Sequence, residues 1–170
     1  MNTEIKIMRY IQNHMRSTYM DKIMIFSSKS LGFAVPLILT SIFSLSFKKY
    51  RFAITTIIAI AFTPFICEHI LKKIWHRARP HTNGIYCHLI IPPPPNFSFP
   101  SSHAATAFSY ALLVQKANGK VGIFAMSFAA IISFSRVYLF VHYPSDVIAG
   151  AGVGLISAQT IYSICDGIPK

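Results

Sequence analysis

The chain has 170 residues, of which 53% are hydrophobic and only 12% are Asp, Glu, Lys or Arg. Typical soluble domains contain about 25% charged residues, so this composition excludes an ordinary soluble domain and predicts an integral membrane protein. The formal net charge of +11 would suit a nucleic-acid-binding protein if the basic residues followed one soluble face. They instead form short clusters between apolar segments, which is typical of membrane topology signals and anion ligands. We therefore expect no nucleic-acid partner.

The apolar segments predict an all-α integral membrane bundle of about five transmembrane helices. A helix needs about 20 apolar residues to cross a bilayer. The segments that approach this length cover residues 23–47 (cleanest from residue 30), 52–71, 101–114, 121–141 and 147–164. The third is short, because a helix of about 14 to 16 residues rises only about 21 to 24 Å. A chain of this length is expected to form a single domain over residues 1–170.

A different pattern precedes these segments. Apolar side chains recur at helical spacing from Ile5 to Tyr19, and basic and polar side chains fall between them. This amphipathic pattern predicts an N-terminal helix that lies in the membrane interface and does not cross the bilayer. No small-residue cleavage site follows a short apolar core, so we do not expect a removed signal peptide.

The connections between the spans predict the orientation. Those after the first and third spans share one side of the membrane and contain five basic residues and no acidic one: Lys48, Lys49, Arg51, Lys116 and Lys120. By the positive-inside rule this side is cytoplasmic. The segment of residues 72–100 and the segment around His142 then lie together on the outer face. Four basic residues before the first span oppose this orientation: Lys6, Arg9, Arg16 and Lys22.

Ionisable residues gather at the outer ends of the predicted spans. The second span ends in EHILKKIWHRARP, the third begins with FPSSHAATAF, and the fourth leads into SRVYLFVHYPSD. Taken singly, Lys72 and Arg79 could be snorkelling anchors, and Arg136 with Asp146 could be a structural ion pair. However, ionisable groups inside a membrane are costly unless partners offset the cost. Several cations, two histidines and a carboxylate at one membrane boundary therefore predict a functional anion site.

These residues resemble the three signature motifs of the type 2 phosphatidic acid phosphatase superfamily, which also includes vanadium haloperoxidases. The matching residues lie within 72–146 and are Lys72-x6-Arg79-Pro80, Pro100-Ser101-Ser102-His103 and Ser135-Arg136-x5-His142-x3-Asp146. The stretch MDKIMIFSSKSLG and the overall size further resemble the small bacterial members that include undecaprenyl-diphosphate phosphatases. One position departs from the family pattern, because Ser102 stands where the family usually has Gly.

The resemblance implies that His142 attacks phosphorus to form a phosphohistidine and that Asp146 holds the other ring nitrogen. His103 is then the expected general acid, which protonates the leaving oxygen and later activates water. Phosphoryl transfer needs fixed donors around the equatorial oxygens. The expected phosphate-binding residues are Lys72, Arg79, Ser101, Ser102 and Arg136. We expect no bound metal and no other cofactor, because the seven histidines show no metal-ligand spacing with carboxylates or thiols.

The short third span bears on the substrate, because it places His103 at or slightly below the headgroup plane. A lipid phosphate reaches this depth by lateral diffusion, so we expect a lipid phosphatase of the bacterial plasma membrane with its site on the extracytoplasmic side. The resemblance favours undecaprenyl diphosphate, the recycled wall-precursor carrier that bacitracin sequesters. A phosphatidylglycerol phosphate or phosphatidic acid phosphatase and a lipid phosphotransferase stay open. A headgroup-binding protein without activity is disfavoured by intact His103, His142 and Asp146. The oligomeric state is not indicated.

Several further residues have expected roles. Glu68 precedes Lys72 by one helical turn and is expected to pair with it. For His76 and Arg77, contact with the substrate and contact with lipid headgroups are both open. The stretch IPPPP at residues 91–95 is expected to form a stiff polyproline segment that ends the outer loop. No disulfide is required among the three cysteines, Cys67, Cys87 and Cys165.

Overall fold

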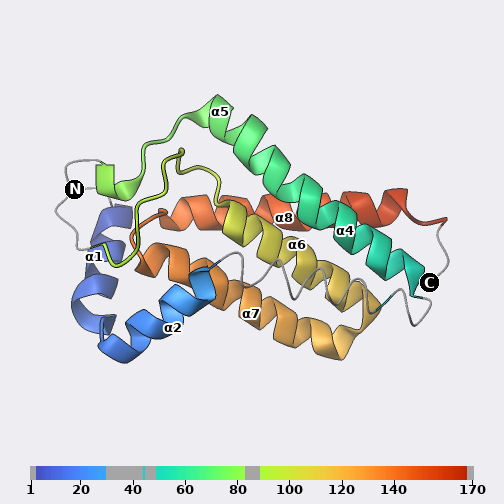
Figure 1. Ribbon diagram of the computed structural model, residues 1–170, viewed down its shortest axis with the longest axis horizontal. Coiled ribbons are helices and arrows are strands. Elements are labelled where there is room, and N and C mark those ends of the chain that lie inside the picture. Colours follow the sequence, from blue (N-terminus) through green and yellow to red (C-terminus); the bar gives the residue numbers. More distant parts are fainter. Residues whose placement is uncertain (1–2, 30–43, 45–48, 83–88, 168–170) are drawn as a thin grey trace.

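The computed structural model describes the chain except for residues 1–2, 30–43, 45–48, 83–88 and 168–170 (Figure 1). The α-helices are α1 (Thr3–Met15), α2 (Thr18–Ser28), α4 (Tyr50–Phe65), α5 (Lys72–Trp75), α6 (Ser102–Ala117), α7 (Gly119–Tyr138) and α8 (Pro144–Ile164). A π-helix, η1 (Ile66–Leu71), joins α4 to α5, and a short 3-10 helix, η2 (Pro80–Thr82), follows. No strand occurs among the described residues, and the predicted all-α class is confirmed.

Three segments of the described chain are long and apolar enough to cross a membrane: Tyr50–Thr82, Gly119–Tyr138 and Pro144–Ile164. The helix α6 has 16 residues, in agreement with the short third span predicted from the sequence. The clean part of the first predicted span, from residue 30 onwards, lies almost entirely outside the described residues. The predicted fourth span ran to residue 141, but α7 ends at Tyr138 because the chain turns there into the loop that carries His142.

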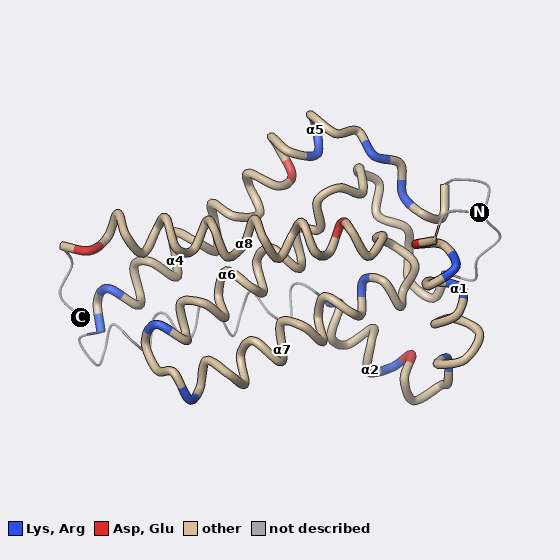
Figure 2. Tube along the Cα trace, turned by 180° about the vertical axis from the view of Figure 1, so that it is seen from behind, with Lys and Arg blue, Asp and Glu red and all other residues tan. Residues whose placement is uncertain are grey.

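The outer surfaces of the long helices are apolar. Large side chains such as Ile58 and Phe62 of α4, Phe124 of α7 and Ile156 of α8 are between 41% and 76% exposed. In Figure 2 the middle of these helices is free of coloured Lys, Arg, Asp and Glu, which lie towards the ends. Exposed apolar surface of this extent faces lipid in a membrane protein. The bundle is therefore a membrane protein, as the composition predicted.

The N-terminal segment forms two helices where the sequence predicted one. The Ser17 side chain accepts a hydrogen bond from the Met20 N–H at 3.2 Å and caps α2, which separates it from α1. Met8 and Ile11 of α1 are buried against residues 137–141 and Tyr143. The apolar stripe of α1 thus packs partly on protein, at the end of the bundle where α7 leads into α8 (Figure 1).

The helices α6 and α8 pack backbone against backbone. A Cβ added at Gly154 would lie 2.1 Å from the Ala105 carbonyl oxygen, and one at Gly150 would lie 2.4 Å from the Ser101 carbonyl oxygen. Small residues permit such close approach between membrane helices. The contact brings the first turns of both helices together, and the Ser101 N–H donates to the Asp146 carbonyl oxygen at 2.9 Å. Two of the three motifs therefore meet at this point.

Candidate active site

Lys72 is held at the end of a π-helical turn. Such turns within longer helices often occur at functional sites. The Lys72 side chain is buried, and its Nζ lies 2.6 Å from Glu68 Oε1, which confirms the predicted pair. Glu68 also accepts hydrogen bonds from Ser102 Oγ and Asn96 Nδ2, each at 2.5 Å. Glu68 therefore connects the first motif to the second.

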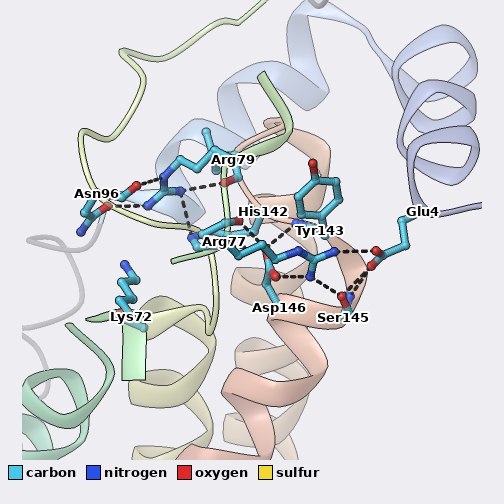
Figure 3. Close-up of polar contacts among 12 residues, drawn as sticks. Glu4, Lys72, Arg77, Arg79, Asn96, His142, Tyr143, Ser145 and Asp146 are labelled. Atoms are coloured by element: carbon cyan, nitrogen blue, oxygen red, sulfur yellow. Dashed lines mark hydrogen bonds and ion pairs between the residues drawn. The ribbon is translucent and has the colours of Figure 1, made fainter. Parts of the chain in front are cut away.

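Arg79 is buried and makes four polar contacts. Its Nε and Nη2 donate to the backbone and side-chain oxygens of Asn96 at 2.7 and 2.6 Å, and its Nη1 donates to the Val141 carbonyl oxygen at 2.7 Å. The same Nη1 lies 3.3 Å from His142 Nε2 (Figure 3). A guanidinium has only donors, so Nε2 is the acceptor. A neutral His142 then carries its proton on Nδ1, and its Nε2 lone pair accepts the hydrogen bond from Arg79.

His142, in the loop before α8, and Asp146, in the first turn of α8, face each other, and both are buried. Their closest atoms, Nδ1 and Oδ2, are 3.6 Å apart, which is longer than an ordinary hydrogen bond. The Nδ1 atom has no hydrogen-bond partner in the described part of the chain. Asp146 Oδ2 instead accepts from the Tyr143 N–H at 2.9 Å and from the Ser98 hydroxyl. The structure thus brings the pair together without the bond that the resemblance implied.

The loop that carries His142 contains a strained residue. Phe140 has a φ of 61°, in the left-handed region where a residue other than glycine costs roughly 1–2 kcal/mol. Its side chain is fully buried in the cluster that includes Met8 of α1, and such packing holds the unfavourable conformation. The His142 N–H donates back to the Arg136 carbonyl oxygen at 3.3 Å. The loop therefore folds over the end of α7 and directs His142 towards α8.

Burial makes His142 a neutral base. It lowers the pKa of His142 below the ordinary range; Asp146 opposes this shift, and the positive charges of Arg79 and Arg136 add to it. A histidine in such surroundings is unprotonated at neutral pH. This is the form that a nucleophilic imidazole needs.

The two serines of the second motif differ in their contacts. Ser101 Oγ is buried and has no hydrogen-bond partner among the described residues. Ser102 was predicted to bind phosphate through its backbone amide, and its hydroxyl donates to Glu68. The Ser102 and His103 N–H groups belong to the first turn of α6, where amides have no partner within the helix. A phosphate contact by Ser102 is therefore expected from its backbone amide.

Arg136 and His103 complete the cluster. Arg136 is buried, its Nη1 donates to Ser28 Oγ of α2, and its Nε has no hydrogen-bond partner in the described chain. His103 lies within electrostatic reach of Arg136, His142, Lys72 and Arg79. All the predicted site residues therefore gather at one end of the bundle.

Sequence analysis named Arg77, with contact to the substrate or to lipid headgroups left open, but it missed the contact of Arg77 with Asp146 and did not identify Asn96 or Ser98. Asn96 and Ser98 follow the polyproline segment, and Arg77 lies inside the first motif at an unspecified position. Arg77 Nη1 is 2.5 Å from Asp146 Oδ1, and its Nη2 is 2.7 Å from Glu4 Oε2 (Figure 3). The place of Arg77 between Lys72 and Arg79 was the only sequence signal for any of these residues.

Two other features lie apart from this cluster. Among the described residues, no group of three or more His, Cys, Asp or Glu side chains could hold a metal ion. A cavity of about 350 Å³ lies at the opposite end of the bundle and touches none of the motif residues. It is lined by Lys49, Arg51, Phe52, Thr55, Leu113, Lys116, Ala117 and Tyr162.

The fold and the site define a helical membrane protein with a buried cluster of cations, histidines and one aspartate at one end. Residues 52–167 match the PAP2 superfamily. The chain belongs to this superfamily, and the resemblance of its motifs is confirmed.

Similar proteins include two undecaprenyl-diphosphatases. The one from Bacillus subtilis (strain 168) is 26% identical over 170 residues, which cover 98% of this chain and 85% of that protein. The one from Sulfolobus acidocaldarius is 28% identical over 139 residues, which cover 81% of this chain and 67% of that protein. The crystal structure of a transmembrane PAP2-type phosphatidylglycerolphosphate phosphatase from Bacillus subtilis superposes with a TM-score of 0.76. It is 21% identical, and the match covers 98% of this chain and 86% of that chain.

Proposed function

We propose that this protein is a membrane lipid phosphatase that removes the terminal phosphate of undecaprenyl diphosphate through a phosphohistidine. The observation that carries the proposal is the environment of His142. Its Nε2 accepts from Arg79 at 3.3 Å, and its Nδ1 faces Asp146 at 3.6 Å. The buried ring is thus neutral, with an Nε2 lone pair that must exchange its hydrogen bond from Arg79 for phosphorus and with Nδ1 beside a carboxylate. The undecaprenyl-diphosphatases among the relatives support the substrate.

The reaction has two steps. In the first, His103 takes up a proton as the negatively charged diphosphate enters the site. His142 Nε2 then attacks the terminal phosphorus while the bond to the bridging oxygen breaks, and His103 gives its proton to that oxygen as undecaprenyl phosphate leaves. Asp146 stabilises the positive charge that develops on the ring. In the second step, His103 takes a proton from water, which attacks the phosphohistidine. Inorganic phosphate leaves, and His142 is neutral again.

The charge of the site suits a phosphoryl group. Arg79 and Arg136 are bonded to neutral groups in the described structure, so their positive charges stay available to phosphoryl oxygens. Lys72 adds a third cation, although Glu68 pairs with it. Fixed charges of this kind stabilise the transition state without reorganisation. Activity is therefore expected to survive a chelator and to be blocked by vanadate. Loss of activity with a chelator and recovery with magnesium would contradict this mechanism.

The substrate is tested with purified protein in detergent and His142→Ala protein as the control. Phosphate release is measured from undecaprenyl diphosphate, phosphatidylglycerol phosphate and phosphatidic acid. We expect the highest kcat/KM with the prenyl diphosphate, and higher expression in cells should raise resistance to bacitracin. A tenfold higher kcat/KM with a glycerolipid would contradict undecaprenyl diphosphate as the substrate, but the protein would still be a lipid phosphatase. Transfer of the phosphoryl group to a lipid alcohol in place of water would identify a phosphotransferase.

The proposal includes one phosphatase domain over residues 1–170 in the plasma membrane, with the site on the extracytoplasmic side. Cys165 is buried, so two exposed positions at opposite ends of the bundle provide a sharper test of the orientation. Tyr19 at the site end and Lys120 at the opposite end are exposed and can each be replaced by cysteine in a cysteine-free chain. A membrane-impermeant maleimide added to intact cells should label Tyr19→Cys only. Labelling of Lys120→Cys only would place the site in the cytoplasm.

A further inference from the structure

The two oxygens of Asp146 have different surroundings. Oδ2 faces His142, whereas Oδ1 forms an ion pair with Arg77 Nη1 at 2.5 Å. Asp146 is fully buried, and a buried carboxylate without a charged partner is costly. Arg77 is therefore the charged partner of Asp146 on the Oδ1 side, whereas Oδ2, which accepts from the Tyr143 N–H and the Ser98 hydroxyl, is the oxygen that faces His142.

Arg77 is itself held on several sides. Its Nη1 also donates to Ser145 Oγ at 2.6 Å, and its Nη2 forms an ion pair with Glu4 at 2.7 Å. Its guanidinium carbon lies 4.0 Å from the centre of the Tyr143 ring, and its backbone oxygen accepts from the Ser98 N–H at 2.8 Å. Figure 3 shows the side chain between Glu4 and Asp146. Because both terminal nitrogens are engaged, Arg77 is not placed as a free phosphate ligand.

Glu4 brings the N-terminal helix into this arrangement. Its Oε1 accepts from the Ser145 N–H at 3.0 Å and from Ser145 Oγ at 2.6 Å, so it also binds the first turn of α8. Burial acts to raise the pKa of Glu4, but hydrogen bonds from Ser145 and Arg77 outweigh it and hold the pKa below its ordinary value. Glu4 is thus charged at neutral pH. The apolar contact of Met8 with the His142 loop fixes the same helix beside the site.

We propose that Arg77, Glu4 and Ser145 form a clamp that positions Asp146 for His142, and that α1 is therefore a working part of the active site. The clamp rests on the proposed function, because it assigns Asp146 the task of holding His142. Arg77 is a positioning residue that acts through Asp146. Without it the carboxylate can rotate, and the positive charge that pairs with Asp146 is lost, so the negative charge of Asp146 acts on His142 uncompensated. Protonation of His142 should then become easier.

The test compares the variants Arg77→Gln, Arg77→Lys, Glu4→Gln and Ser145→Ala with Arg16→Gln. The control is matched, because Arg16 forms an ion pair with Asp21 at 3.1 Å and their side chains are 23% and 21% exposed, against 28% and 21% for Arg77 and Glu4. Steady-state kcat and KM are measured with a prenyl diphosphate between pH 5 and 9. Titration of His142 is followed by NMR of ¹⁵N-histidine-labelled protein, with His142→Gln for assignment.

We expect Arg77→Gln to lower kcat by about 30- to 100-fold with KM changed by less than about threefold, since the transition state loses a correctly oriented nucleophile. The acid limb of kcat/KM and the His142 titration should both move to higher pH. Arg77→Lys should recover part of the rate, and Glu4→Gln and Ser145→Ala should lower kcat by about 3- to 10-fold. The double variant Arg77→Gln/Glu4→Gln should resemble Arg77→Gln alone. Arg16→Gln should stay within about twofold of the parent.

Three results would overturn the clamp. A tenfold rise in KM with unchanged kcat in Arg77→Gln would make Arg77 a substrate ligand. A kcat equal to that of the parent in Arg77→Gln would show that Arg77 has no positioning role. If Arg77→Gln fails to fold, the same result in Glu4→Gln would contradict the clamp. If His142 titrates at the same pH in folded Arg77→Gln as in the parent, Arg77 does not act through Asp146. If the parent released no phosphate from any lipid phosphate, the proposed function would fail, and the NMR titration would still decide the clamp.

Discussion

Each end of the bundle contains a buried arginine, but the partners of the arginine charge differ between the two ends. At the end opposite the site, Arg51 forms an ion pair with Asp166 at 2.5 Å, donates to the Tyr162 carbonyl oxygen at 3.0 Å and stacks on the Tyr162 ring at 3.9 Å. At the site end, Arg79 is bonded to two oxygens of Asn96, to a carbonyl oxygen and to His142. In the described structure Arg51 is neutralised by a carboxylate, whereas Arg79 is held by neutral groups.

The position of the carboxylates follows the same division. The Asp166 side chain is 78% exposed, whereas Asp146 is fully buried beside His142. The cavity at the opposite end is lined by three cationic side chains but by no histidine among the described residues. Cations near a membrane surface are therefore not enough to make this site. The site end combines two arginines, Arg79 and Arg136, that form no ion pair with a carboxylate among the described residues, with a buried nucleophile and a carboxylate beside it.

Replacement of the nucleophile should give the largest contrast between the ends. We expect His142→Ala to lower kcat by about a thousandfold or more, because no other described side chain offers a comparable attacking nitrogen. Asp146→Asn should lose most of its turnover as well. Phosphate release in detergent measures both, and size-exclusion profiles check folding. A kcat of His142→Ala within tenfold of the parent value would contradict the assignment of His142 as the nucleophile.

Arg79 and Arg51, buried at opposite ends of the bundle, offer a matched pair of variants. Arg79→Gln should lower kcat/KM by about a hundredfold, because a charge aimed at the phosphoryl group is lost. Arg51→Gln should stay within about threefold in activity while lowering the melting temperature, since it breaks a buried structural contact. Kinetics and thermal unfolding of both variants measure this contrast. Equal losses of activity would mean that the two ends are functionally coupled.

The acidic partners of the cations can be compared in the same way. Glu68→Gln should lower kcat by about tenfold, because Glu68 aligns Lys72, Asn96 and Ser102 but touches no reacting atom. Asp166→Asn should stay within about twofold, as expected for an exposed charge. A loss in Glu68→Gln as large as in His142→Ala would show instead that Glu68 takes part in the chemistry.

The smallest expected effect concerns stability and pH. Because the pKa of His142 is lowered in the folded protein, the unfolded chain binds its proton more readily below about pH 6.5. The parent should therefore lose stability as the pH falls through this range. His142→Gln should lose less stability over the same pH range, so its melting temperatures at pH 7.5 and 5.5 should lie closer together than those of the parent. An equal or larger loss in the variant would contradict a neutral, buried His142.

The sequence determined the features that depend on local spacing or on chain order. Glu68 and Lys72 are four residues apart in the same helix, so their pairing followed from helical geometry. The convergence of the motifs followed from an even number of membrane crossings between them. The close approach of α6 and α8 was not predicted, because Gly150 and Gly154 show only that a contact is possible.

Only the tertiary structure decided which side chains support the site. Arg79 meets Asn96 across 17 residues and Arg77 meets Glu4 across 73 residues, separations for which no sequence period exists. The same holds for α1, whose amphipathic pattern predicted an apolar face but not that residues 137–141 would cover part of it. A periodic pattern records that a side of a helix avoids water. Which surface covers that side depends on the packing of all the other helices.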